Sequence, residues 1–150
     1  MTERAPHCPT CSQAGTPADR ITLKALLTPD GLRRGVPAQP SYCPTAECPT
    51  VYFDVDGGAT FTEADLTVRV YAKHPGDPEM PVCYCFNVNV GSMCAGRARE
   101  LREMVAHEVQ AHHCACEVKN PKGGCCLGDL VRIERGYEHA DPHSSCCAVS

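Results

Sequence analysis

Closely spaced thiols limit the folds open to this chain more than any other feature. Thirteen of the 150 residues are cysteine, and most of them fall into short groups separated by longer stretches. Only 5% of the residues are aromatic, none is Trp, and there are 12 Gly and 13 Pro, so we do not expect a large hydrophobic core. Small domains with thin cores usually need covalent or metal cross-links, and the cysteines are the candidates for that role.

The amino terminus favours metal sites over disulfides. The stretch MTERAPHCPTC lacks the apolar run of a secretory signal peptide, and no later segment is long and apolar enough to span a membrane. We therefore predict a cytoplasmic protein without membrane insertion, in a compartment where thiols stay reduced and cysteine groups bind metal. An odd number of cysteines also fits complete disulfide pairing poorly.

Charge and motifs exclude several classes of function. The formal net charge is −4, and each four-cysteine site with zinc or an oxidised cluster would add about −2 to it. No basic stripe is present, so nucleic-acid binding is not expected. The chain also lacks a paired-carboxylate motif, a G-x-S-x-G elbow and a P-loop, so we predict that it is not an enzyme.

Composition divides the chain into four parts. Residues 1–73 contain β-prone stretches and predict a small zinc-ribbon-like β module, and residues 74–81, with three prolines and a glycine, predict a linker. Residues 82–137 contain the best helical pattern and predict a small helical module. Residues 138–150 predict a flexible tail rich in Cys and His. The expected fold class is α+β.

Local patterns suggest particular elements within these parts. Residues 20–27 form a short apolar stretch, and residues 66–71 alternate between apolar and polar side chains, so both favour strands. Residues 28–41 are expected to form a loop. A helix is expected over 95–112, where apolar residues repeat every four positions, and a second over 127–135, ended by Gly136.

The first candidate metal site joins two thiol pairs. Cys8-x₂-Cys11 and Cys43-x₄-Cys48 could each place two thiolates on one side of an ion, and zinc prefers four tetrahedral ligands. A closed four-cysteine shell leaves no open coordination position, which favours a structural zinc site over a catalytic or transfer site. His7 is an alternative ligand beside Cys8.

The second candidate site has an unusual spacing. The side chains of Cys83-x-Cys85 diverge if the segment is extended, so this pair suits an iron–sulfur cluster better than a single ion. Cys116 and Cys126 follow after the helical stretch, which would bring the two pairs together. The sequence NPKGG between them predicts a turn that passes close to a cluster.

Combined, these motifs resemble a known family. VCYCF, a helical stretch and then CEVKNPKGGCCLGDL are similar to the [2Fe–2S] domain of the bacterioferritin-associated ferredoxin (BFD) type. With HCPTC, YCPTAECPTVYFD and DLTVRVYAK, residues 7–135 resemble the amino-terminal module of CopZ-type copper chaperones. The resemblance implies Zn²⁺ and a [2Fe–2S] cluster. The zinc ligands it implies are Cys8, Cys11, Cys43 and Cys48. The cluster ligands it implies are Cys83, Cys85, Cys116 and one thiol of the pair Cys125–Cys126.

Two neighbouring cysteines are candidates for the fourth cluster ligand. Cys126 is the predicted ligand because CLGDLVRIE resembles the start of the final helix, and a helix N-terminus favours an anionic cluster. Cys125 is the alternate. Cys114 precedes the motif and is expected to be free, and Cys94 is expected to be a small core residue.

The carboxyl-terminal part departs from the family. CopZ-type chaperones carry a further heavy-metal-associated domain with an M-x-C-x-x-C loop, which these 150 residues do not contain, so copper delivery is not carried over whole. The segment HADPHSSCCAVS instead offers the adjacent thiols Cys146 and Cys147. Thiolates with nearby imidazoles suit soft ions, so this pair could capture Cu(I), Cu(II) after reduction, or Hg(II) as transient cargo. The other interpretation is an unstructured tail with incidental thiols.

Three functions follow from these sites. The first is a metallochaperone-like protein for copper or another thiophilic metal, whose cluster transfers single electrons or reduces the metal. Its partners would be an electron donor and a metal-transport or heavy-metal-associated protein. The second is a ferredoxin-type electron-transfer protein with structural zinc. The third is a non-redox adaptor that holds two zinc ions.

Overall fold

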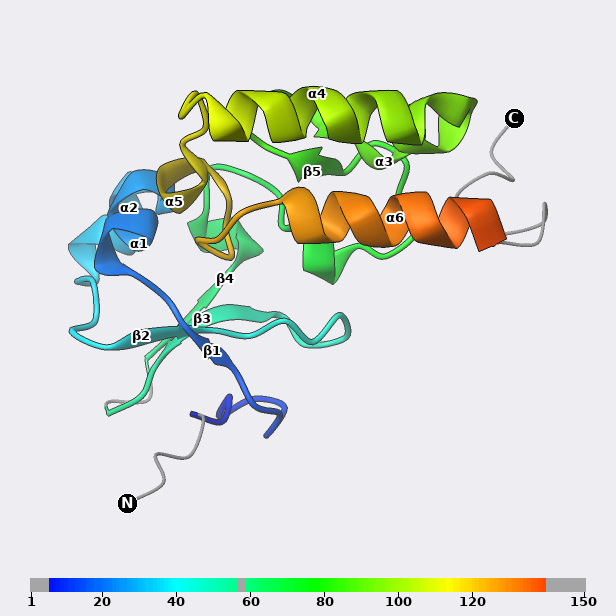
Figure 1. The fold of residues 1–150 in the computed structure, drawn as a ribbon. Coiled ribbons are helices and arrows are strands. Elements are labelled where there is room, and N and C mark those ends of the chain that lie inside the picture. The colour runs from blue at the N-terminus through cyan, green and yellow to red at the C-terminus, as the bar shows by residue number, and fades with distance from the viewer. Residues whose placement is uncertain (1–5, 57–58, 140–150) are drawn as a thin grey trace, which may run out of the picture.

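The structure, a computed structural model, describes residues 6–56 and 59–139, with the backbone alone at 94–95 and 136–139. It is a mixed α+β fold with two small antiparallel sheets, which confirms the predicted class. Helices α4 and α6 lie side by side above the larger sheet, and α1, α2 and α5 gather at one end (Figure 1). None of the described helices is long and apolar enough to cross a membrane.

The first half of the chain forms a four-stranded sheet with the order β1-β2-β3-β4. Its strands are short and antiparallel, with Ser41 opposite Phe53 and Phe53 opposite Thr60. The elements of this half are β1 (Thr16–Pro17), α1 (Arg20–Leu26), α2 (Pro29–Arg33), β2 (Pro40–Tyr42), β3 (Thr50–Asp54), β4 (Thr60–Thr62), η1 (Glu63–Asp65) and η2 (Tyr71–Lys73).

The second half pairs a two-stranded sheet with helices. Its elements are β5 (Pro81–Cys83), β6 (Val88–Asn89), α3 (Val90–Ser92), a π-helical turn η3 (Met93–Arg97), α4 (Ala98–Gln110), α5 (Cys116–Lys119) and α6 (Leu127–His139). The predicted helix over 95–112 thus becomes α4, with Gly96 at a φ of 85° in the turn before it. Helix α6 continues three residues beyond Gly136, where the sequence predicted its end.

Helix α1 occupies Arg20–Leu26, so the strand predicted over residues 20–27 is wrong. Asp19 caps α1 by accepting a hydrogen bond from the Ile21 amide. Leu26 and Leu27 follow Leu23 by three and four positions, and all three are buried, so a helix places them on one apolar face. The segment predicted as a loop also contains a helix, α2, which begins after the side-chain cap of Thr28.

The predicted strand over 66–71 is also absent from the structure. Leu66 makes one isolated bridge to Leu27, and the chain then turns into η2. The Glu63 carboxylate accepts a hydrogen bond from the Val70 amide at 2.8 Å and lies 2.7 Å from His74 Nε2. These contacts take the place of ladder hydrogen bonds and fold the segment back on η1.

Candidate metal centres

The structure brings the four cysteines of the first half together. Cys8 and Cys11 lie in the turn before β1, while Cys43 follows β2 and Cys48 precedes β3. All four Sγ atoms lie within 4.8 Å of one another. Two of the Sγ–Sγ distances are 3.8 Å, between Cys8 and Cys48, and 3.6 Å, between Cys11 and Cys43.

These distances fit one tetrahedral ion. Four sulfurs at about 2.3 Å from zinc have edges of about 3.8 Å. The site is also shielded from water, because Cys43 is fully buried and Cys8, Cys48 and the packed ring of Phe53 are each less than 5% exposed. The group of four holds thiols alone, and His7, the alternative ligand, is exposed and outside it.

The thiols of this site differ in acidity. The side-chain hydrogen bond between Cys11 Sγ and Thr45 Oγ1, 3.5 Å apart, lowers the pKa of Cys11 to about 6, whereas burial raises the pKa of Cys48 to about 11. Four thiolates at this spacing would repel one another, and the buried ones would also lose hydration. A divalent cation removes both penalties, so the donor set fits Zn²⁺.

The wide second turn of the site is held by a buried lysine. Lys73, in η2, is 9% exposed, and its Nζ donates a 2.7 Å hydrogen bond to the carbonyl of Thr45. The amide of Cys48 donates to the same carbonyl at 3.2 Å. Lys73 therefore fixes the extra residues between Cys43 and Cys48 and places a positive charge beside an anionic metal site.

We expect Lys73→Met to weaken the zinc site while leaving the fold in place. Loss of one charged hydrogen bond should lower the free energy of unfolding by about 2 kcal/mol, and zinc should be released faster. Urea unfolding and transfer of zinc to a chromogenic chelator measure the two effects. Lys24→Met is the matched control, since Lys24 is exposed on α1. Equal zinc release from both variants would contradict this role of Lys73.

The second group of thiols converges on the core of the second half. Cys83 ends β5, Cys85 lies in the following turn, Cys116 begins α5, and Cys126 directly precedes α6. Cys85 Sγ lies 3.7 Å from Cys116 Sγ and accepts a hydrogen bond from the amide of Ala115 at 3.1 Å. Cys83, Cys116 and Cys126 are buried in one apolar cluster, and Cys85 packs against it.

The thiols of this group interact as two pairs. A hydrogen bond between the thiols of Cys83 and Cys126 lowers the pKa of Cys83 to about 7 and raises that of Cys126. Burial raises the pKa of Cys116, the partner of Cys85, to about 12. Within the described residues, these thiols do not form a single tight group like that of the first site. Two separate pairs fit a binuclear cluster, in which each iron takes two thiolates.

The remaining cysteines lie in different surroundings. Cys125 is exposed, whereas Cys126 is fully buried. Cys114 is half-buried and packs against the edge of the same cluster. The side chain of Cys94 and the tail thiols Cys146 and Cys147 lie outside the part of the chain that the structure describes.

The loop between Cys116 and Cys126 is anchored on the first half of the chain. Thr22 in α1 donates a 2.5 Å hydrogen bond from its hydroxyl to the carbonyl of Glu117, and the Tyr52 hydroxyl donates to the carbonyl of Pro121. Gly123 has a φ of 75°, and a Cβ there would lie 3.2 Å from Thr22 Oγ1. The turn was expected from NPKGG, but no local pattern indicates Thr22 or Tyr52, because both act across long sequence separations.

A known copper chaperone is similar to this chain in sequence and in fold. Residues 5–67 match the zf_CopZ family, described as a zinc binding domain. Over 128 residues the chain is 29% identical to the copper chaperone CopZ of Archaeoglobus fulgidus, an alignment that covers 85% of this chain and 61% of the relative. The X-ray structure of the A. fulgidus CopZ N-terminal domain matches with a TM-score of 0.66 and 29% identity, over 85% of this chain and 96% of that one.

These matches support the resemblance at a coarse level. The expected resemblance to CopZ-type chaperones is confirmed as a CopZ-like zinc-binding domain, with a four-cysteine group that fits Zn²⁺. This points to metal handling. The chain spans about three fifths of the length of the curated relative, so the activity of that whole protein does not transfer directly.

Proposed function

We propose that this chain handles a thiophilic metal and holds a [2Fe–2S] cluster beside a structural zinc site. The observation that carries the proposal is the arrangement of Cys83, Cys85, Cys116 and Cys126, two thiol pairs against one apolar core. The similarity to a copper chaperone supports metal handling. A BFD-like second module is part of the same proposal.

The chain's own residues would hold and insulate the cluster. When bound, a [2Fe–2S] cluster exchanges single electrons. The apolar cluster around Cys83 and Cys126 excludes water, and the amide of Ala115 donates to Cys85 Sγ, a type of contact that stabilises a ligating thiolate. The half-buried Cys85 is the most accessible of the four thiols, which makes its side the expected route for electrons.

The cargo and the partners belong to the same proposal. Copper or another soft ion would be reduced with electrons from a donor protein and passed to a metal-transport or heavy-metal-associated protein in the cytoplasm. The tail thiols Cys146 and Cys147 are the proposed capture pair. The chain would act as a carrier without enzymatic turnover.

Metal analysis of anaerobically purified protein tests the cluster. We expect about one zinc, two iron and two acid-labile sulfide per chain, with visible absorption. The Cys83→Ser/Cys85→Ser double variant is the control, and it should keep zinc but lose iron, sulfide and colour. A colourless wild-type protein with two zinc ions and no iron would instead indicate the zinc adaptor.

Removing residues 138–150 tests metal handling separately from the cluster. We expect the truncated protein to keep its cluster but to lose stoichiometric binding of Cu(I) or Hg(II), measured by competition with a chromogenic chelator. Unchanged binding would contradict the role of the tail. A full-length protein that holds the cluster but binds neither ion would be a ferredoxin-type electron carrier.

A further inference from the structure

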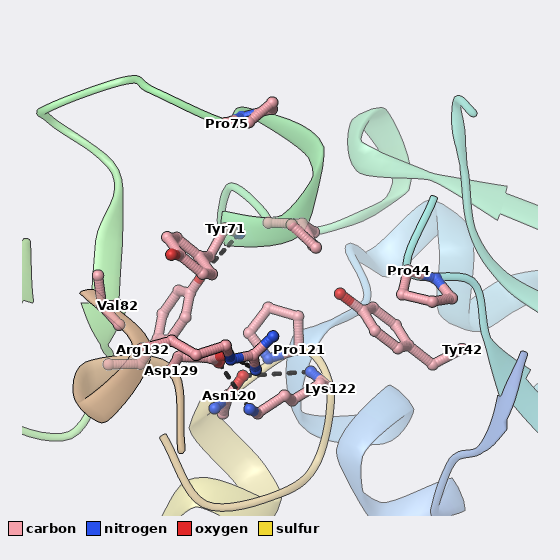
Figure 2. Close-up of a pocket in the computed structure, with 13 residues that line it drawn as sticks. Tyr42, Pro44, Tyr71, Pro75, Val82, Asn120, Pro121, Lys122, Asp129 and Arg132 are labelled. Atoms are coloured by element: carbon pink, nitrogen blue, oxygen red, sulfur yellow. Dashed lines mark hydrogen bonds and ion pairs between the residues drawn. The ribbon is translucent and has the colours of Figure 1, made fainter. Parts of the chain in front are cut away.

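A pocket of about 340 Å³ lies between the two halves of the chain, near the second thiol group. Tyr42 and Pro44 line it from the zinc-binding half, and Tyr71 lines it from η2. Lys122, Asp129 and Arg132 line it from the loop before α6 and from α6 itself (Figure 2). Neither metal site uses these side chains, so the pocket needs an explanation of its own.

The hydroxyl of Tyr42 is a hydrogen-bond donor that faces this pocket. Tyr42 is only 5% exposed, and among the described residues its hydroxyl makes no hydrogen bond. Figure 2 shows this hydroxyl pointing into the pocket, away from the strand that carries it. A tyrosine hydroxyl is protonated at neutral pH and can donate one hydrogen bond. No fully buried side-chain oxygen or nitrogen of the described residues lacks a partner, so this hydroxyl is accessible from the pocket and can donate to an acceptor atom of a ligand there.

The pocket also carries a net positive charge. The Asp129 carboxylate lies between two cations, with Oδ2 at 2.6 Å from Lys122 Nζ and Oδ1 at 2.5 Å from an Arg132 guanidinium nitrogen. One carboxylate against two cations leaves a charge of about +1, and both cations keep further N–H groups for a second acceptor. The side chains of Asp129 and Lys122 are 11% and 28% exposed, so their ion pair fixes Lys122 at the pocket, whereas Arg132 is 77% exposed and reaches Asp129 from the solvent side.

The remaining surface of the pocket is largely apolar. Proline rings and aliphatic side chains form the walls between the polar groups: Pro44, Val70, Ala72, Pro75, Val82 and Pro121. Tyr84 supports one wall, because its hydroxyl donates to the carbonyl of Arg69 at 2.6 Å and accepts from the amide of Tyr71 at 3.1 Å. Unlike Tyr42, it is already satisfied within the protein. Apolar walls with a few polar groups are typical of a site for a small organic molecule.

We propose that this pocket binds a small organic acid, whose carboxylate contacts Lys122 and Arg132 and whose second acceptor oxygen takes the hydrogen bond of Tyr42. The apolar body of the ligand would lie against the proline and valine walls. An inorganic oxyanion could use the cations but would leave these walls and Tyr42 without a partner. The inference goes beyond the proposed metal handling and does not depend on it.

Levulinate is a suitable probe because it has a carboxylate, a short apolar chain and a keto oxygen. Binding to the metal-loaded full chain can be followed by saturation-transfer NMR of the probe. Methyl levulinate lacks the charge and pentanoate lacks the keto oxygen, so the two analogues test the two halves of the proposal. We expect levulinate to bind more tightly than either analogue.

Variants assign the binding to this pocket. Lys122→Met should weaken levulinate binding about tenfold, whereas Lys119→Met, an exposed neighbour outside the pocket, should not change it. Tyr42→Phe should weaken levulinate about fivefold but leave pentanoate unchanged. The latter variant removes a hydroxyl without a partner, so its fold and zinc content should be retained.

Several results would overturn the proposal. Equal binding of levulinate and its methyl ester would rule out recognition of the carboxylate. Equal loss in Lys119→Met and Lys122→Met would place the binding elsewhere, and failure of levulinate to bind the folded, zinc-loaded protein would remove the site. Displacement of levulinate by inorganic phosphate at equal concentration would show a plain anion site without organic selectivity.

Discussion

Cys126→Ser is expected to abolish the second metal centre, whereas Cys125→Ser should leave it intact. Cys126 is fully buried, packs in the apolar cluster of the second half and shares a hydrogen bond with Cys83. The exposed Cys125 lies outside that cluster. Serine oxygen is a poor ligand for iron in a thiolate site, so loss of Cys126 should remove nearly all iron, sulfide and visible absorption.

The adjacent thiols form a matched pair for this experiment. Both variants change one sulfur to oxygen within the same turn, so any difference between them reports position rather than chemistry. Zinc content should stay at about one ion per chain in both. The opposite result, with loss of the cluster in Cys125→Ser alone, would move the fourth ligand to the exposed position.

Cys43→Ser should remove the zinc and destabilise the first half of the chain. Cys43 is fully buried between β2 and β3, and its amide donates a 2.8 Å hydrogen bond to the carbonyl of Val51. Structural zinc contributes directly to folding, so we expect the free energy of unfolding to fall by more than about 3 kcal/mol. Zinc analysis and urea unfolding measure the effect.

Cys114→Ser is the control for that experiment, because Cys114 belongs to neither predicted ligand set. It should keep both metals and nearly the wild-type stability. A Cys43→Ser protein that retains a full zinc equivalent would contradict the four-thiol site.

Loss of the zinc should affect the second metal centre, whereas loss of the second centre should not affect the zinc. Thr22 and Tyr52 of the zinc-binding half hold the loop between Cys116 and Cys126 through the carbonyls of Glu117 and Pro121. Loss of zinc should therefore lower the iron content as well, whereas Cys126→Ser should leave zinc in place. Full iron content in zinc-free Cys43→Ser would show that the two halves hold their metals independently.

Part of this architecture could be predicted because metal ligation is local chemistry. The spacings at Cys8–Cys11 and Cys43–Cys48 indicated two thiol turns that can share one ion, and the structure places their sulfurs at tetrahedral distances. The α+β class followed from apolar periodicity in the same way. Helix α1 (Arg20–Leu26) was missed, because a seven-residue apolar segment fits either the helical or the strand period. Its helical form depends on the Asp19 cap and on burial of Leu23 and Leu26.

By itself, then, the sequence determined the thiol pairs, the turns around them and the α+β class, since each depends on residues close together in the chain. Only the tertiary structure decided that Cys126 is buried and Cys125 exposed, that Lys73 reaches the Thr45 carbonyl and that Thr22 holds the loop after Cys116. It also decided that Tyr42 and Lys122 face one pocket. These features join residues 28 to 95 positions apart, and side-chain contacts at such separations leave no periodic signal in the sequence.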